Sequence, residues 1–297
     1  TPPFYRAPMI VTVHDLQPLM MPEWSGGRPW PLPWLYQRFY HWMYPSAFAR
    51  AARLLAVSET TRGLLIQRYP QWAGKIHATP NGFIPNPLPL HPEEVWERLR
   101  RQYDLPQRYI FYVGSTRPNK NLERMIRAFA QLRRGEPSAA DLGFVLVLTP
   151  DRFLASVERT IEACGLRPHI RILPPVDTEA KTVLLQRARL LFFVTRLEGF
   201  GLPILEAQST GTPVLTSNAD ASPEVAGEGA LLVDWADVEQ QCRALARLLP
   251  DEPLRRDLAE KGRRNLDRFR WEQTARATLA QYHEALGRPS TPGTTAP

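Results

Sequence analysis

Two glutamates, eight residues apart, frame a short glycine-containing segment of this chain. The segment reads EGFGLPILE, beginning at Glu198 and ending at Glu206. Gly199 and Gly201 allow the backbone to come close to a ligand, because neither carries a side chain. Pro203 is typical of the first turn of a helix, since it has no N–H group to leave without a partner. The pattern predicts a loop that contacts a ligand and then enters a helix.

The same segment follows an apolar run at residues 190–194, which predicts a buried strand. A loop between the carboxyl end of a strand and the start of a helix is where phosphate binds in parallel α/β sheets, because free N–H groups and the helix dipole face the anion. The carboxylates of Glu198 and Glu206 can accept hydrogen bonds from hydroxyl groups, which sugars and ribose supply. A tight turn with two solvated glutamates is the alternative.

A second group of residues places cations after another predicted strand. Residues 109–113 form an apolar run, and Gly114, Ser115, Arg117 and Lys120 follow it. Breaking a glycosyl–phosphate bond leaves negative charge on the diphosphate, so cations fixed beside it lower the barrier. Arg117 and Lys120 suit that role, although cations are also common in ordinary surface loops.

His14 follows the apolar run at residues 10–13 and precedes Asp15. A single histidine at the end of a strand has a structural role as readily as a functional one, and the residues alone leave both open.

Aromatic side chains are concentrated between residues 24 and 44. They are Trp24, Trp30, Trp34, Tyr36, Phe39, Tyr40, Trp42 and Tyr44, with Arg28, Arg38 and His41 among them. Such a segment could line an acceptor cleft or rest at a lipid interface. It could equally be the buried face of one helix.

The remaining pattern is an alternation of short apolar runs with segments of helical period, which predicts βαβ units and a parallel sheet. Strands are predicted at residues 10–13, 54–57, 109–113, 144–148, 170–173, 190–194, 213–216 and 230–233, with a further segment at 76–80. Helices are predicted at about 121–135, 151–164, 178–189, 203–210, 237–249, 252–268 and 271–286. The fold class is therefore α/β, and the continuous apolarity of the strands predicts burial on both faces.

Domain organisation follows from where the strands fall. Six strands between residues 109 and 233 make a complete doubly wound domain, predicted to span 105–270. Residues 1–100 have too few strands for a complete sheet, so they are expected to form a partial Rossmann-like domain. The low apolar content of residues 287–297 predicts a disordered tail.

Composition limits the class of protein. The chain has 297 residues, of which 43% are hydrophobic and 23% charged, as in globular proteins. The net charge of +7 favours anionic partners, but no nucleic-acid-binding pattern appears, and solvated helix faces account for many of the arginines.

Cys164 and Cys242 have no disulfide or zinc spacing, so both are expected in the core of a protein from a reducing compartment. No membrane span or signal peptide is visible, which predicts a cytoplasmic location, with the inner face of the membrane left open.

Taken together, these motifs resemble those of family 4 retaining glycosyltransferases. The resemblance covers about residues 9–286 and rests on the EX7E segment, its continuation AQSTGTPVL, and the later SPEV. Further matches, in the family's order, are VHDL at 13–16, VSE at 57–59, PNG at 80–82, VGS at 113–115 and PNKNL at 118–122. Membership implies a GT-B fold, with the N-terminal part of the first domain lacking here.

The resemblance also implies roles for individual residues. Glu206 would bind the ribose hydroxyls of a donor nucleotide, and Glu198 would contact the donor sugar. The backbone amides of Phe200, Gly201 and Leu202 would hold sugar and phosphate.

Other positions would complete the same site. Backbone groups near Val176 would hold the nucleobase, Gly114 and Ser115 would lie along the donor, and His14 would approach the reacting centre. Many relatives carry an arginine where this chain has Ser115, so Arg117 would supply that cation from a shifted position.

The implied reaction is transfer of a hexose from a nucleotide-diphosphate sugar to a hydroxyl acceptor, a glycan or a lipid-linked sugar, with retention of configuration. No Asp-x-Asp motif follows a strand, so no metal and no other cofactor are expected. The segment at 271–286 resembles the family's closing helix, which packs back on the first domain.

Three alternatives compete with this interpretation. A glycoside hydrolase needs two carboxyl groups but has no use for a phosphate loop between them. A nucleotide-binding oxidoreductase would show a G-x-G-x-x-G segment after a strand, which is absent. A non-catalytic nucleotide-sugar-binding subunit, completed by a second chain that supplies the acceptor half, stays open.

Overall fold

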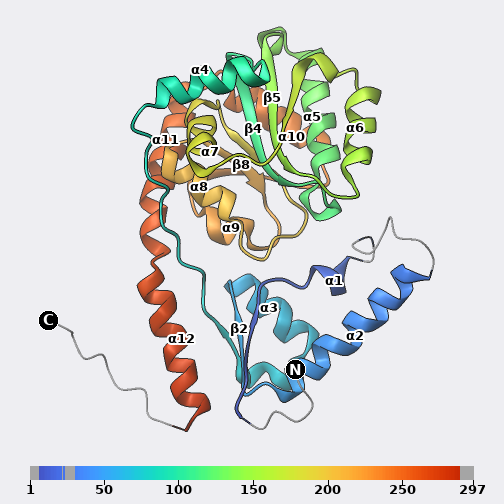
Figure 1. Ribbon diagram of the computed structural model, residues 1–297, viewed down its shortest axis with the longest axis vertical. Helices are drawn as coiled ribbons and strands as arrows, with labels where there is room; N and C mark the ends of the chain where they lie inside the picture. The colour runs from blue at the N-terminus through green and yellow to red at the C-terminus, as the bar shows by residue number, and fades with distance from the viewer. Residues whose placement is uncertain (1–6, 22, 24–30, 288–297) are drawn as a thin grey trace, which may run out of the picture. The chain divides into compact units, whose positions relative to one another are not determined.

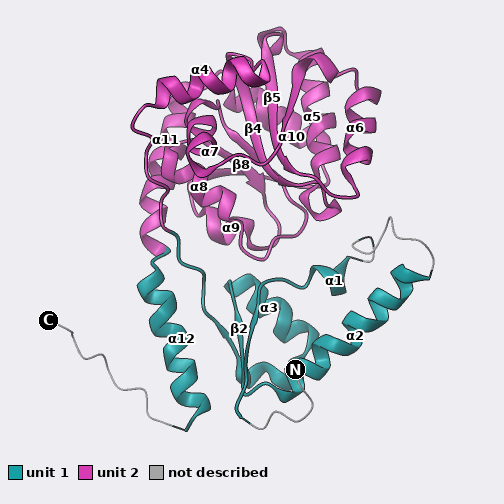
Figure 2. Cartoon of the chain, viewed as in Figure 1, with its two compact units in different colours: residues 1–83, 269–297 teal, residues 84–268 magenta. Residues whose placement is uncertain are grey.

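The computed structural model describes residues 7–21, 23 and 31–287. The predicted tail, from residue 288 onward, lies outside the described residues, as do Trp24, Arg28 and Trp30 of the aromatic segment. The chain divides into two compact units (Figure 2). Unit 1 comprises residues 1–83 and 269–297, and unit 2 comprises residues 84–268.

Unit 2 contains a six-stranded sheet in which every pair of neighbouring strands is parallel. Its strands are β4 (Arg108–Ser115), β5 (Leu142–Thr149), β6 (Ile170–Leu173), β7 (Leu191–Phe193), β8 (Val214–Ser217) and β9 (Ala230–Val233). The spatial order is β6-β5-β4-β7-β8-β9, so the chain builds outward from β4 in one direction and then, with β7, in the other. This is the doubly wound topology that the sequence predicts.

Helices cover both faces of this sheet (Figure 1). They are α4 (Pro92–Tyr103), α5 (Leu122–Gly135), α6 (Leu154–Ala163), α7 (Thr178–Arg187), α8 (Leu202–Thr210), α9 (Ala221–Ala226), α10 (Val238–Leu248) and α11 (Glu252–Asn265), with the 3₁₀ turns η3 (Pro118–Lys120), η4 (Pro137–Ala139), η5 (Arg167–His169) and η6 (Leu266–Arg268). On one side α5 packs against α6 and α10, and on the other α7 packs against α4 and α8. The expected two-sided burial is confirmed for the inner strands β5, β7 and β8, in which only the last residue of β5 is exposed. It is wrong for the edge strand β9, where Leu232 is 37% exposed.

Unit 1 contains a three-stranded parallel sheet of order β1-β2-β3 among its described residues. Its elements are β1 (Ile10–Val13), α1 (Gln17–Met20), α2 (Leu32–Arg50), β2 (Arg53–Ala56), α3 (Glu59–Arg68), η2 (Pro70–Lys75), β3 (Ile76–Ala78) and α12 (Trp271–Ala285). The C-terminal helix α12 belongs to this unit: Thr274 Oγ1 donates to the Pro80 carbonyl at 2.6 Å, and Arg53 pairs with Glu284 at 3.4 Å.

The boundary between the units lies nearer residue 84 than the predicted residue 100. The reason is α4, whose Val95, Trp96 and Leu99 are buried in unit 2, with Trp96 stacked on Tyr109 at 6.0 Å between ring centroids. Helices α1, α3, α4 and α9 were not among the predicted helices. In α9 six residues are too few to show a helical period.

The expectation that both cysteines lie in the core is wrong. Cys164 and Cys242 are half-buried, each with a free thiol.

Candidate functional site

The site begins where the sheet of unit 2 changes direction. Strands β4 and β7 are neighbours in the sheet but are separated in the chain by β5 and β6. The loops that leave the carboxyl ends of two such strands diverge to opposite sides of the sheet and leave a crevice, which is where ligands bind in open α/β sheets. The loop after β4 carries Lys120, and the loop after β7 carries Glu198.

Lys120 and Glu198 meet across this crevice. The Lys120 Nζ lies 2.6 Å from Glu198 Oε2, and the two side chains are only 16% and 14% exposed. The ammonium also lies 5.5 Å from the centroid of the Phe193 ring, within the range of a cation–π contact. Limited exposure reduces solvent screening, so this pair is stronger than an ordinary surface ion pair.

A second ion pair holds the other glutamate of the motif. Lys181 Nζ lies 2.5 Å from Glu206 Oε1, with the side chains 21% and 16% exposed. Lys181 lies on α7, whose start is fixed by Asp177, because the Asp177 carboxylate accepts a hydrogen bond from the Ala180 N–H at 2.7 Å. Sequence reasoning missed Lys181. Its one local signal is a position one turn into a capped helix that follows the predicted nucleobase segment.

Two glycines are required by the local geometry. Gly201, which precedes α8, has φ of 102°, a conformation that residues with a side chain rarely adopt. At Gly114 a Cβ would lie 2.7 Å from the Tyr112 hydroxyl oxygen, which itself donates to the Ser115 carbonyl at 2.9 Å. Burial, followed by the charges of Glu198 and Asp151, raises the pKa of Tyr112 well above its ordinary value, so this hydroxyl stays protonated.

Asp220 fixes the backbone at the start of the motif. Its carboxylate accepts a hydrogen bond from the Glu198 N–H, and its φ of 56° lies in the region that favours glycine. Non-glycine residues held in such conformations are often found at functional sites, where the surrounding structure compensates the strain. The predictions did not include Asp220, because nothing in its sequence neighbourhood marks a contact to a residue 22 positions earlier.

The other predicted residues of unit 2 occupy the same edge of the sheet. Phe200 is buried, Leu202 is exposed at the first position of α8, and Val176 is half-buried just before the cap of α7. Ser115 is the last residue of β4. Arg117 lies exposed at the start of η3, and its carbonyl accepts a hydrogen bond from the Lys120 N–H at 2.9 Å.

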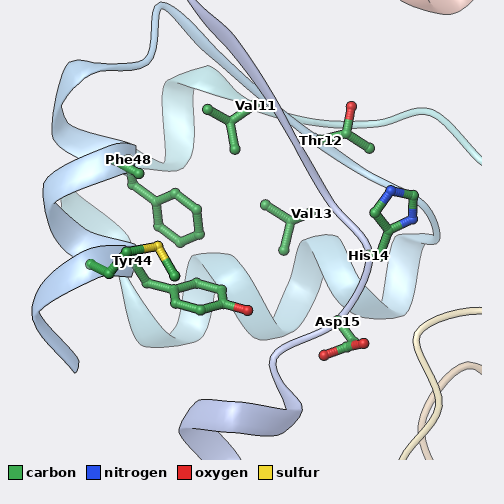
Figure 3. A pocket seen from close by; sticks show the side chains of 9 residues that line it. Val11, Thr12, Val13, His14, Asp15, Tyr44 and Phe48 are labelled. Carbon is green, nitrogen blue, oxygen red and sulfur yellow. The ribbon is translucent and has the colours of Figure 1, made fainter. Parts of the chain in front are cut away.

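His14 lies in unit 1, exposed, directly after β1. It is one of the residues lining a cavity of about 250 Å³ (Figure 3). Along the strand, Val11 and Val13 point toward the rings of α2, whereas His14 lies on the opposite side. The cavity also includes Tyr44, whose pKa rises to about 12 because of burial and, secondarily, the charge of Asp15.

The aromatic segment divides between two environments. Tyr40, Tyr44 and Phe48 of α2 face the core of unit 1, as expected for a buried helix face. Trp34 and Trp42, in contrast, are 51% and 66% exposed. The buried-face alternative is therefore confirmed for one side of this helix, and the acceptor-cleft or lipid-interface role of its exposed side stays a prediction.

Comparison with protein families assigns the class. Residues 97–265 match the family model described as Glycosyl transferases group 1, and residues 2–86 match that described as Glycosyltransferase Family 4. The first match covers most of unit 2, including both ion pairs. The chain therefore belongs to the group 1 glycosyl transferase family, and the predicted resemblance is confirmed.

Individual relatives agree with this assignment. The chain is 30% identical to D-inositol 3-phosphate glycosyltransferase of Salinispora tropica over 95% of its own length and 60% of that protein's. It is 27% identical to O-antigen chain mannosyltransferase B of Escherichia coli, covering 92% of this chain and 69% of the relative. The chain thus spans less than two thirds of the first of these relatives.

Solved structures show the same fold. Sucrose-phosphate synthase from Thermosynechococcus elongatus matches with a TM-score of 0.72 at 22% identity, over 94% of this chain and 68% of that one. An α,α-trehalose-phosphate synthase from Burkholderia vietnamiensis matches with a TM-score of 0.73 at 16% identity, over 95% and 68%. The GT-B-type α/β fold is confirmed, with unit 2 as the doubly wound C-terminal part and unit 1 as a partial N-terminal one.

Proposed function

We propose that this chain is the catalytic part of a retaining glycosyltransferase, which transfers a hexose from a nucleotide-diphosphate sugar to a hydroxyl acceptor. The observation that carries the proposal is the Lys120–Glu198 ion pair at the topological switch point, beside the start of α8. A cation fixed there can neutralise the charge that develops on a leaving diphosphate. The second pair, Lys181–Glu206, supplies the carboxylate proposed to bind ribose.

The two ion pairs suggest how a donor would enter. A diphosphate would compete with Glu198 for the Lys120 ammonium and thereby release the Glu198 carboxylate to accept hydrogen bonds from the donor sugar. The amides of Phe200, Gly201 and Leu202 would complete the anion site at the start of α8. An oxygen of the departing phosphate would take the acceptor proton, so the protein contributes position and charge. His14 and Arg117 are proposed as further contacts near the reacting centre.

For the sugar we propose mannose first, because several relatives are mannosyltransferases. For the acceptor we propose a glycan or a lipid-linked sugar, with transfer at the inner face of the membrane. In the part of the chain that the structure describes, none of the helices has the length and hydropathy of a membrane span. An exposed part of α2 favours contact with a lipid surface instead: the helix has no acidic side chain, and the Arg38 guanidinium lies 5.0 Å from the centroid of the Trp34 ring.

The alternative, a nucleotide-sugar-binding subunit without catalysis, is not favoured by the comparisons, since the relatives named above are transferases or synthases. As a partner we propose a second polypeptide that completes the first domain.

A screen of sugar nucleotides tests the proposal. The protein is incubated with GDP-mannose, UDP-glucose, ADP-glucose and dTDP-rhamnose, and both its thermal unfolding and the slow release of nucleotide diphosphate are measured. A ligand at about 100 times its Kd adds about 2.7 kcal/mol to stability, so one nucleotide class should stand out. Release should be unchanged by EDTA, because we propose that Lys120 replaces a metal. A chain that neither binds nor cleaves any of these donors contradicts the proposal.

A further inference from the structure

Three consecutive residues after β4 all reach across to the segment that leaves β7. Asn119 Nδ2 donates to the Leu197 carbonyl at 3.1 Å, and Asn121 Nδ2 donates to the Val194 carbonyl at 3.0 Å. Between them lies Lys120, which pairs with Glu198. We call these three contacts the clamp. It joins the segment that carries the cation to the segment that carries the motif carboxylate.

The clamp depends on an unusual backbone. In a continuous helix successive side chains diverge by about 100°, so three adjacent residues cannot all face one segment. Here η3 ends at Lys120, and Asn121 adopts φ of 57° and ψ of 24°, in the left-handed region, before α5 begins. Asparagine is one of the few residues with a side chain that enter this region readily. The backbone of Asn121 therefore changes the direction of the chain, while its side chain still contacts the segment that leaves β7.

The Asn121 carboxamide is the most fully used group of the clamp. Besides the Val194 carbonyl, its Nδ2 donates to the Trp235 carbonyl at 2.7 Å, and its Oδ1 accepts from Arg124 Nη1 at 3.2 Å. The residue is 5% exposed. With both amide hydrogens on carbonyl oxygens, the amide orientation is fixed. One side chain thus connects the ends of β7 and β9 to the start of α5.

We propose that Asn121 is a positioning residue for the Lys120–Glu198 pair. This inference rests on the proposed function, because it assigns the clamp to the alignment of the cation with the leaving diphosphate. Misplacement of a catalytic group by about 1 Å can cost about 100-fold in rate. The nucleotide itself is proposed to be held mainly by Glu206 and the segment near Val176, which the clamp does not touch. Loss of Asn121 should therefore lower kcat much more than nucleotide affinity.

Asn121→Gly is the informative variant, because glycine keeps the left-handed backbone and removes only the carboxamide. The assay uses whichever of GDP-mannose and the other sugar nucleotides the screen identifies as the donor. We expect the rate of nucleotide diphosphate release from it to fall by about 10- to 100-fold. The Kd of the free nucleotide diphosphate should change by no more than about 3-fold, which is less than one power of ten in affinity. Asn119→Ala removes one clamp bond without altering the left-handed residue, and it should show a smaller fall in the same rate.

Asn265→Ala provides a matched control in unit 2. Asn265 is also buried, and its Nδ2 also donates two hydrogen bonds, to Gln208 Oε1 at 2.9 Å and to the Val225 carbonyl at 2.8 Å. It should lower Tm as much as Asn121→Gly does while leaving the rate of release within about 2-fold, the change expected away from coupled sites.

A double-mutant cycle with Lys120→Met separates positioning from general destabilisation. If Asn121 acts through Lys120, Asn121→Gly should have little further effect on the rate once Lys120 is methionine. Independent, multiplicative effects would overturn the inference, as would an Asn121→Gly variant that loses Tm but cleaves the donor at the wild-type rate. If that variant does not fold, Asn119→Ala decides by the same cycle. A wild-type chain that cleaves no donor overturns the proposed function, and the inference with it.

Discussion

Replacing Lys120 by methionine tests the central ion pair most directly. Methionine keeps an apolar chain of similar length and removes the charge, which leaves Glu198 without its partner at 14% exposure. Breaking a fully buried pair costs about 3–5 kcal/mol, and an exposed pair is worth about 0.2–1 kcal/mol. At 16% and 14% exposure the loss should lie between these limits, at about 2 kcal/mol of unfolding free energy.

Stability and rate should respond differently to this change. For a domain of this size, a loss of about 2 kcal/mol lowers Tm by about 4–8 °C. The variant lacks the positive charge of Lys120 that would face the leaving diphosphate, and this loss should reduce kcat by about 10²- to 10³-fold. Differential scanning calorimetry measures the first effect, and initial rates of nucleotide release at saturating donor measure the second.

The double variant Lys120→Met with Glu198→Gln separates the two effects. It removes both charges, so Tm should return to within about 2 °C of the wild-type value. The rate should stay low, since the cation is still missing. If the two substitutions instead lower Tm additively, the side chains do not interact in solution, and the Lys120–Glu198 ion pair is refuted.

Three further outcomes are expected. Lys181→Met should raise KM for the donor more than it lowers kcat, because it leaves Glu206 without its ion-pair partner. Steady-state kinetics measure both constants, and a fall in kcat alone would contradict this prediction. Gly201→Ala should destabilise the fold by about 1–2 kcal/mol in urea unfolding, since φ of 102° is unfavourable for a residue with a Cβ. Gly74→Ala is the control and should not destabilise the fold, because a Cβ at Gly74 would have no neighbour within 4 Å. The pKa of Tyr44 is raised to about 12 in the folded protein, from 10.0, so its contribution to stability is complete below pH 10 and is lost as pH rises toward 12. The Tm of the Tyr44→Phe variant should therefore fall less between pH 10 and pH 12 than the Tm of the wild type.

Much of the architecture was accessible from the sequence. The inner strands β5 and β7 are largely continuous apolar runs, because a strand that is buried on both faces of a parallel sheet needs apolar side chains on both sides. The Glu198–Glu206 segment was equally visible, because its two carboxylates, glycines and proline act within one loop and one helix turn. Helices α1, α3, α4 and α9 were missed, and α1 and α9 are too short for periodicity to show them.

The contacts that make the site were decided by the tertiary structure. Lys181 reaches Glu206 across 25 residues, Asp220 reaches Glu198 across 22, and Asn121 reaches Val194 across 73. Hydrophobic periodicity reports which face of an element is buried, but it carries no information about which loops meet at the carboxyl edge of a sheet. That depends on strand order, and only the placement of β7 beside β4 brings Lys120 and Asn121 to the motif.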